Sequence, residues 1–255
     1  MKNFFFGGLF ALQFFSIIPV HQEIEPGPSR VRWSLRWLPL VGLGFGAMNA
    51  VLFLLLNTYT EISLLSLVLL AIIIPIVLSG GLHLDGLMDT GDAYFSYQDP
   101  EKRLDVMKDP RTGAFGVMVL LIVLALRFIF IYEALLVDEA AVWFLLIVPC
   151  FARMAMVGLL GHAPSAKTSG LSSFFQKSYD PSVTWWLLGT SFFLIIGCFF
   201  ISIGVSIAMG LAVFAGVWII KSWAVKAFRG ITGDVCGAML EGMVTFLWLI
   251  IWIFI

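Results

Sequence analysis

The sequence alternates long apolar runs with shorter polar stretches. A bilayer core of about 30 Å is crossed by about 20 apolar residues in one helix, so each long run predicts a membrane span. The segment 4–18 is shorter, which leaves three alternatives open: it spans the bilayer with the help of other helices, re-enters it, or lies at its surface. The run 185–220 is too long for one span and predicts two helices with a turn near residues 202–204. The remaining runs, which meet the required length or end the chain, cover residues 38–57, 63–82, 115–137, 140–161 and 240–255.

These runs predict an all-α fold, a polytopic membrane helical bundle with seven or eight transmembrane helices. The sequence has no internal repeat, so residues 1–255 are expected to form a single integral membrane domain. Composition supports this interpretation, since 60% of the residues are hydrophobic and 12% are charged, against roughly 25% charged in a typical soluble domain. The net charge of −1 argues against nucleic acid as a partner, because neutralising phosphates requires an excess of Lys and Arg. Membrane lipid is the expected environment, and the sequence leaves open whether the chain forms a homo-oligomer.

Basic residues indicate which loops face the cytoplasm, because short cytoplasmic loops are enriched in Lys and Arg. The connections 58–62 and 138–139 and the turn near 204 contain neither residue. The segments that alternate with them carry Arg30, Arg32, Arg36, Lys102, Arg103, Lys108, Arg111, Lys167, Lys177, Lys221, Lys226 and Arg229. We therefore expect a multi-pass protein of the cell (inner) membrane whose longer loops, including the loop 83–114, are cytoplasmic.

The most informative polar stretch is residues 79–92, at the expected cytoplasmic end of the second long run. Asp85, Asp89 and Asp92 are spaced i, i+4 and i+7, so a helix places their carboxylates on one face. The sequence has no Lys or Arg between positions 36 and 102 to offset their mutual repulsion. Oxygen ligands favour a hard cation such as Mg²⁺, which commonly completes its shell with substrate phosphates. The spacing predicts a Mg²⁺ site for phosphoryl or nucleotidyl transfer, although acids also solvate the ends of helices.

Further polar positions on either side of these acids extend the hypothesis. His83 falls on the helix face roughly opposite to Asp92, so we interpret it as orienting substrate or carrying a proton rather than as a ligand. In a later polar segment, Asp109 could add a metal ligand while Lys108 and Arg111 hold phosphate. An ordinary surface helix with salt bridges explains these later residues equally well.

A last polar segment contains Arg229 and Asp234 near a Gly turn. These two residues could form a second cradle for phosphate or metal, although such turns are common. Arg127 and Arg153 lie within apolar runs, and ionisable residues at membrane depth usually face the protein interior. Internal ion pairing and contact with substrate explain the two arginines equally well.

Several stretches of the chain resemble the cobalamin synthase family, the adenosylcobinamide-GDP ribazoletransferases. The likeness is most specific in residues 80–92, which read GGLHLDGLMDTGD. It continues in residues 107–113 (MKDPRTG) and 232–238 (TGDVCGA). Segments 14–20 and 38–46 share it, so the resemblance covers nearly the whole chain.

The resemblance implies a Mg²⁺-dependent membrane transferase that joins adenosylcobinamide-GDP to α-ribazole or α-ribazole 5′-phosphate. The products are adenosylcobalamin or its 5′-phosphate, together with GMP, at the last stage of cobalamin nucleotide-loop assembly. The implied catalytic residues are His83, Asp85, Asp89 and Asp92. The expected metal ligands are Asp85, Asp89, Asp92 and Asp109. The expected contacts with substrate and its phosphates are Lys108, Arg111, Arg229 and Asp234.

Two other functions fit part of the pattern. A CDP-alcohol phosphotransferase also uses a carboxylate cluster, but its DGxxAR motif is not met, because Asp89 and Thr90 stand where Ala and Arg are required. A transporter could use Arg127 and Arg153 in a path across the membrane. Against the transporter, the strongest polar cluster lies at one membrane edge, and the sequence shows no repeated pair of broken helices.

Overall fold

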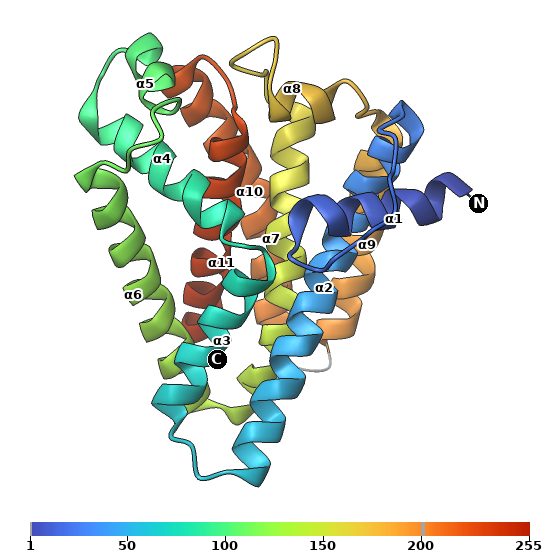
Figure 1. Cartoon of the computed structure of the whole chain (residues 1–255). Helices are drawn as coiled ribbons and strands as arrows, with labels where there is room; N and C mark the ends of the chain where they lie inside the picture. The colour runs from blue at the N-terminus through green and yellow to red at the C-terminus, as the bar shows by residue number, and fades with distance from the viewer. Residues whose placement is uncertain (1, 200–201) are drawn as a thin grey trace.

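The computed structural model describes residues 2–199 and 202–255. The secondary structure of this part is helical, apart from one isolated bridge between Ser165 and Ile231. The all-α prediction is therefore confirmed, and Figure 1 shows the longer helices packed as a bundle. The longer helices are α1 (Lys2–Phe15), α2 (Pro28–Tyr59), α3 (Leu64–Leu78), α4 (Leu82–Ser96), α6 (Ala114–Val137), α7 (Val142–His162), α9 (Pro181–Phe199), α10 (Ile203–Phe228) and α11 (Gly233–Phe254). The short helices between them are α5 (Pro100–Val106), η1 (Glu139–Ala141) and α8 (Leu171–Gln176).

The number of membrane spans is slightly lower than the apolar runs predict. Within the described residues, five helices are long and apolar enough to cross a bilayer, namely α2, α6, η1 with α7, α10 and α11. Helices α3 and α4 pass the same test only as a pair bent by 93°, which gives up to six spans. The expected seven or eight is higher because α3 ends after 15 residues and the apolar part of α9 is short. The run 185–220 divides into α9 and α10 as predicted, and residues 200–201 between them lie outside the described part.

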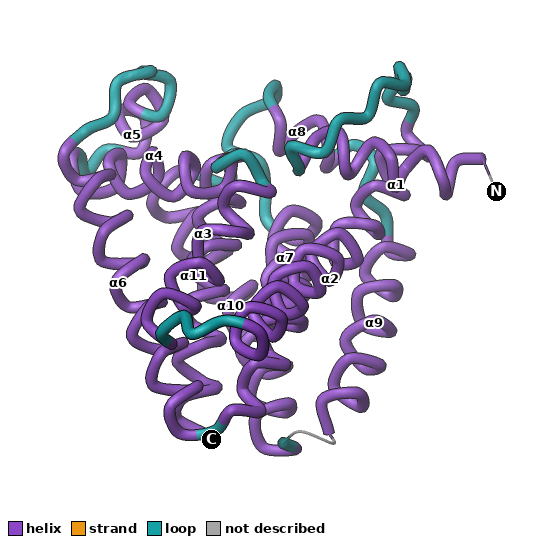
Figure 2. Tube along the Cα trace, turned by 60° about the horizontal axis from the view of Figure 1, so that its bottom comes forward, coloured by secondary structure: helices purple, strands orange, loops and turns teal. Residues whose placement is uncertain are grey.

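Helix α1 lies across one end of the bundle in both views (Figures 1 and 2). Gly7, Gly8 and Ala11 are buried on one face of this helix, whereas Phe5 is 61% exposed. The indole of Trp37 on α2 donates a hydrogen bond of 2.9 Å to the backbone oxygen of Phe4. With 14 residues, α1 is not among the helices long and apolar enough to cross a bilayer. Its course across the end of the bundle favours a helix at the membrane surface among the three placements left open for residues 4–18.

Helix α7 forms the centre of the bundle, because 83% of the apolar window in Glu139–His162 is buried. It packs against α2, α9, α10 and α11, and Phe144 and Phe151 are among its fully buried side chains. The corresponding buried shares of α6 and α10 are 17% and 22%, so these two helices expose most of their apolar surface to lipid. Lipid tails are as apolar as Leu, so close van der Waals packing, rather than escape from water, holds such a bundle together.

A sharp turn separates α3 from α4. Gly80 and Gly81 have φ angles of 64° and 74°, a left-handed backbone that glycine adopts without steric cost. Helix α3 therefore ends at Leu78, and α4 continues obliquely across the same end of the bundle as α1 (Figure 1). Helices α5 and α8 lie at this end too, whereas the connections 60–63 and 138–141 lie at the opposite end. The segments rich in Lys and Arg thus gather at one end, as their alternation along the chain predicts.

Candidate active site

Helix α4 carries the predicted row of carboxylates. Asp85, Asp89 and Asp92 all lie within Leu82–Ser96, and their spacing places them on one helix face, as predicted. Asp85 is exposed, while Asp89 and Asp92 are half-buried. The turn at Gly80 and Gly81 holds this row at the polar end of the bundle rather than at mid-membrane depth.

Helices α4 and α11 cross so closely that their backbones touch. A Cβ atom on Gly86 would lie 2.9 Å from Cα of Asp234, and one on Gly237 would lie 3.0 Å from the backbone oxygen of His83. Glycine at both positions therefore permits the crossing. The crossing places Asp234 beside the acidic row. Its negative charge, like those of Asp85 and Asp92, is close enough to repel the carboxylate of Asp89. The structure thus brings four of the predicted residues together.

The start of α11 fixes the backbone that carries Asp234. Thr232 is the N-cap of this helix, and its Oγ1 accepts a hydrogen bond of 3.2 Å from the backbone nitrogen of Val235. The same hydroxyl lies 3.3 Å from Oδ2 of Asp234, to which it donates. This capping explains why a Thr-Gly-Asp sequence begins the helix at this point.

The stretch 107–113 also passes close to α4 and to the start of α11. A Cβ atom on Gly113 would overlap the carboxylate of Asp92, and one on Gly116 would lie 2.8 Å from the backbone oxygen of Met88. The turn before α6 therefore lies directly against the last acid of the row. Three stretches that are far apart in the sequence thus meet around α4.

A cavity of about 270 Å³ opens beside the acidic row. We call it the outer cavity. Most of its wall is apolar and comes from α1, α2, α7 and α8, including Phe15, Leu35, Leu38, Met156, Val157, Leu160 and Phe175. Its polar lining includes His83, Asp85, Lys167, Ser169, Ser172, Thr232 and Asp234. The cavity can therefore hold an apolar group whose polar end meets carboxylates and one ammonium group.

His83 lies in the wall of the outer cavity and is 3% exposed. Its imidazole stacks on the ring of Phe15, with 6.1 Å between ring centroids and 15° between planes. Its Nε2 atom has no hydrogen-bond partner in the protein. This position fits the predicted role in orienting substrate or carrying a proton.

Sequence reasoning missed Lys167 as a site residue. Lys167 lies in the loop before α8 and lines the outer cavity. Its positive charge is near enough to stabilise the carboxylate of Asp234. The absence of Lys and Arg between positions 36 and 102 suggested that no cation relieves the acidic row, but this lysine comes from a loop far away in the sequence. The only signal in the sequence was that Lys167 is one of the basic residues expected on the cytoplasmic side.

The other predicted phosphate-binding and metal-binding residues form surface ion pairs. Asp109 pairs with Arg111 at 2.6 Å, Lys108 with Asp105 at 2.7 Å, and Arg229 with Glu101 at 2.6 Å. The hydrogen bonds from Arg111 lower the pKa of Asp109 to about 2. The pairs of Asp109 and Lys108 match the alternative of ordinary surface salt bridges, although both residues follow the end of α5. Among the described residues, none of the contacts of Asp109 joins it to the acidic row. The roles of these residues toward substrate and metal remain predictions.

The donor set of the site suits Mg²⁺, although the side chains do not enclose a metal. Among the described residues, no group of three or more His, Cys, Asp or Glu side chains is close enough to hold an ion. Protein Mg²⁺ sites often use one or two carboxylates, with water and substrate phosphates as the remaining ligands. Asp85, Asp89, Asp92 and Asp234 offer such carboxylates beside the outer cavity. The fit is therefore to a cation that arrives with, or is completed by, a phosphate-bearing substrate.

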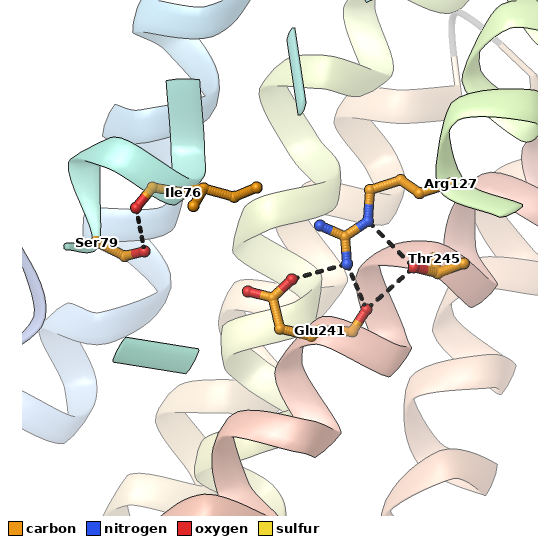
Figure 3. Close-up of polar contacts among 5 residues, drawn as sticks. All are labelled: Ile76, Ser79, Arg127, Glu241 and Thr245. Atoms are coloured by element: carbon orange, nitrogen blue, oxygen red, sulfur yellow. Dashed lines mark hydrogen bonds and ion pairs between the residues drawn. The ribbon is translucent and has the colours of Figure 1, made fainter. Parts of the chain in front are cut away.

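The buried Arg127 pairs internally (Figure 3). Its Nη2 donates to Oε2 of Glu241 at 2.7 Å and to the backbone oxygen of Glu241 at 2.8 Å, and its Nε donates to Thr245 at 3.1 Å. Arg127 and Glu241 are each 5% exposed. Of the two explanations left open for Arg127, internal pairing is the one that the structure supports.

Comparison with known proteins identifies the family. The sequence model of the family described as cobalamin-5-phosphate synthase matches residues 7–252. The chain is 37% identical to an adenosylcobinamide-GDP ribazoletransferase of Geobacillus kaustophilus, over 99% of this chain and 97% of the relative. It is 32% identical to a protein of the same name from Halalkalibacterium halodurans, over 100% and 98% of the two chains. A third relative of that name, from Pseudomonas putida, is 37% identical over 91% of this chain and 92% of its own length. No solved structure matches the chain significantly.

The likeness extends over almost the full length and includes the helices and turns that build the site around α4. The resemblance expected from the acidic motif is thereby confirmed, and the chain belongs to the cobalamin-5-phosphate synthase family.

Proposed function

We propose that the protein transfers the adenosylcobinamide-phosphate group from adenosylcobinamide-GDP to α-ribazole or α-ribazole 5′-phosphate. The products are adenosylcobalamin, or its 5′-phosphate, and GMP. The family and the names of the relatives support this assignment. The observation that carries it is the meeting of Asp85, Asp234 and Lys167 in the lining of a mostly apolar cavity.

The outer cavity is best suited to the acceptor, α-ribazole. Its base is a methylated bicyclic ring with little hydrogen-bonding capacity, which matches walls built from Leu, Met, Val and Phe side chains. A guanine base presents several donors and acceptors that such walls would leave unpaired. A corrin ring is much larger than a cavity of about 270 Å³, so we place the corrinoid outside it, over the exposed side of α4.

Lys167 is the cation of the outer cavity and is suited to a phosphate group. We assign it to the 5′-phosphate of the acceptor when that group is present. The arrangement then holds the base among apolar side chains and directs the ribose towards Asp85 and Asp234.

In the reaction, an acceptor hydroxyl oxygen forms a bond to the phosphorus that bears the cobinamide arm. The bond from that phosphorus to the GMP oxygen breaks, and GMP leaves with the electron pair. His83, in the cavity wall, is placed to orient the hydroxyl or to take its proton. Holding acceptor and donor in register removes much of the entropic cost of a reaction between two substrates.

We propose that the enzyme uses Mg²⁺, held by Asp85, Asp89 and Asp92 with Asp234 beside them, while Asp109 stays a further predicted ligand. When bound, this ion would neutralise the charge of the pyrophosphate and of the departing phosphate oxygen. The close crossing of α4 and α11 fixes the backbones that carry Asp85, Asp89 and Asp234. Asp109 would first have to leave its pair with Arg111.

We further propose that the end of the bundle with α4, α5 and α8 faces the cytoplasm, in the cell (inner) membrane. The gathering of Lys and Arg at that end supports this orientation. Water-soluble substrates such as adenosylcobinamide-GDP and α-ribazole would reach the outer cavity from this side. A reporter fused after Phe254, at the opposite end, should then be accessible only from outside the cytoplasm.

The direct test of the function uses purified protein in lipid nanodiscs. We expect GMP and a matching corrinoid product from adenosylcobinamide-GDP and α-ribazole 5′-phosphate when Mg²⁺ is present, and neither when EDTA is added. Absence of turnover by a folded protein would contradict the proposal. In proteoliposomes, uptake of substrate without release of GMP would favour the transporter instead.

A further inference from the structure

A second cavity lies deeper in the bundle, where α2, α3, α6, α7 and α11 meet the start of α4. We call it the inner cavity, and its volume is about 40 Å³. Its polar lining residues are at most 8% exposed, and they are Asn49, Ser79, His83, Arg127, Arg153 and Glu241. Figure 3 shows three of them: the ion pair of Arg127 and Glu241, and Ser79, whose hydroxyl donates to the backbone oxygen of Ile76. Such a cluster is unusual at membrane depth, where ionisable side chains are costly.

Buried polar atoms without partners concentrate at this cavity. In the described part of the chain, five buried side-chain nitrogen or oxygen atoms have no hydrogen-bond partner in the protein. Three of the five belong to residues of the inner cavity, namely Asn49 Oδ1, His83 Nε2 and Arg153 Nε. Leaving such atoms unpaired costs about 1–3 kcal/mol each, so their convergence on one cavity points to a ligand that they share.

Neighbouring contacts fix two of these groups in place. The amide nitrogen of Asn49 donates to the backbone oxygen of Ala71 at 2.8 Å, which leaves the amide oxygen for another partner. The Nη1 atom of Arg153 donates to the backbone oxygen of Pro149 at 3.1 Å, and the guanidinium lies over the ring of Phe45. Neither side chain can therefore rotate freely to find a partner elsewhere.

The donor and acceptor types select the ligand. Asn49 Oδ1 only accepts a hydrogen bond, Arg153 Nε only donates one, and His83 Nε2 does either according to its tautomer. An anion could serve the donors alone, and a metal ion could serve the acceptors alone. Water serves both, and one water needs about 10–15 Å³ of such a cavity, so the inner cavity has room for it.

We propose that the inner cavity holds water that bridges Asn49 Oδ1, Arg153 Nε and His83 Nε2, and that this bridge sets the orientation of the His83 imidazole. His83 lines both cavities, so a partner on its inner side fixes the ring that faces the substrate. Asn49 and Arg153 are then positioning residues, which act through His83 and do not touch substrate. The hydration is independent of the transferase activity, whereas the positioning role rests on the proposed function.

The hydration is tested by NMR on protein labelled with ¹⁵N in histidine. The chain has three histidines, and His21 and His162 are exposed, so assignment needs only a His83→Gln variant. We expect a cross-peak between water and the His83 ring at Nε2 in the wild type. Asn49→Leu, which keeps a similar volume but lacks the amide oxygen, should shift the His83 Nε2 resonance and leave the other two histidines unchanged. A His83 ring without water contact in the folded wild type would overturn the proposal.

The positioning role is tested by kinetics on the same variants. Asn49→Leu should lower kcat about tenfold, because small misplacements of a reacting group are costly, while KM for either substrate changes less than twofold. Asn57→Leu is the matched control, since Asn57 is exposed on the same helix and lines neither cavity. If Asn49→Leu does not fold, Arg153→Lys tests the bridge from its other side, because it keeps the charge and lacks Nε.

An Asn49→Leu protein with a shifted His83 resonance and unchanged kcat would overturn the positioning role and leave the hydration supported. A wild type with the water contact and no turnover would contradict the proposed function instead. The two failures are therefore distinguishable.

Discussion

Asp234 and Glu241 lie seven residues apart on α11, and their carboxylates have opposite surroundings. The carboxylate of Glu241 is buried and pairs with Arg127. Thr245 accepts a hydrogen bond from the same arginine and donates one to the backbone oxygen of Glu241. Asp234 stands beside other carboxylates at the edge of a cavity, and its carboxylate accepts a hydrogen bond from the hydroxyl of Thr232. One carboxylate is satisfied by the protein, whereas the other belongs to a set of like charges that no ion pair among the described residues neutralises. The comparison distinguishes Glu241, whose charge stabilises the bundle, from the carboxylates around Asp234, whose charges are available to bind a ligand.

The largest effect should come from removing the second kind of charge. Asp234→Asn keeps the size and the hydrogen bond to Thr232 but removes one carboxylate from the site. We expect kcat to fall about 10²-fold, while the unfolding midpoint stays the same or rises because repulsion is reduced. GMP release and thermal unfolding on one preparation measure both quantities. A parallel loss of stability and activity would mean that Asp234 serves the fold.

Removing the first kind of charge should have the converse result. Glu241→Gln leaves Arg127 buried without its counter-charge, and breaking such a pair costs about 3–5 kcal/mol of unfolding free energy. The activity of the molecules that remain folded should be nearly normal. The double variant Arg127→Met/Glu241→Met should recover most of the stability, because it leaves neither charge unpaired. A stable Glu241→Gln protein without activity would place Glu241 in the site.

A smaller effect is expected from Lys167, the cation that faces the carboxylates. Lys167→Met should raise KM for α-ribazole 5′-phosphate about tenfold, because a charge-assisted contact with phosphate is lost. KM for α-ribazole, which lacks that phosphate, should change little. Comparing the two acceptors on one variant provides the control. An equal increase in KM for both acceptors would show that Lys167 does not bind the 5′-phosphate.

The smallest effect should be seen at Arg229, which pairs on the surface with Glu101. Exposed pairs contribute about 0–1 kcal/mol, so Arg229→Gln should barely change the unfolding midpoint. Arg229 is also a predicted phosphate contact, so Arg229→Gln should raise KM for adenosylcobinamide-GDP severalfold. Glu101→Gln is the matched control, because it breaks the same pair and keeps the arginine. Identical kinetics in the two variants would leave Arg229 with a surface role only.

Local patterns predicted the parts of the fold that depend on local physics. The apolar runs located the helices, and the i, i+4, i+7 spacing placed Asp85, Asp89 and Asp92 on one face. The sequence singled out Asp234 as part of a possible second cradle and of a family motif. Its position beside this row was not foreseen, since it depends on a crossing between helices about 150 residues apart along the chain.

Other features depend on tertiary contacts that no local pattern encodes. Lys167 reaches the outer cavity from a distant loop, and Arg127 finds Glu241 across 114 positions of sequence. The turn before α4 had a visible signal in Gly80 and Gly81, but two adjacent glycines do not specify a bend of 93°. The pairs of Asp109 and Lys108 with nearby opposite charges were foreseen only as one of two alternatives, and the pair of Arg229 with the distant Glu101 was not foreseen.

The central claim is that the unpaired carboxylates of α4 carry the chemistry. It is tested most directly by GMP release from adenosylcobinamide-GDP and α-ribazole 5′-phosphate, as a function of Mg²⁺ concentration, for the wild type and Asp89→Asn in nanodiscs. Asp89 lies between the other acids of the row, so we predict Mg²⁺-dependent turnover in the wild type and a loss of about 10²-fold in the folded variant. Full turnover by folded Asp89→Asn, with an unchanged dependence on Mg²⁺, would contradict the claim.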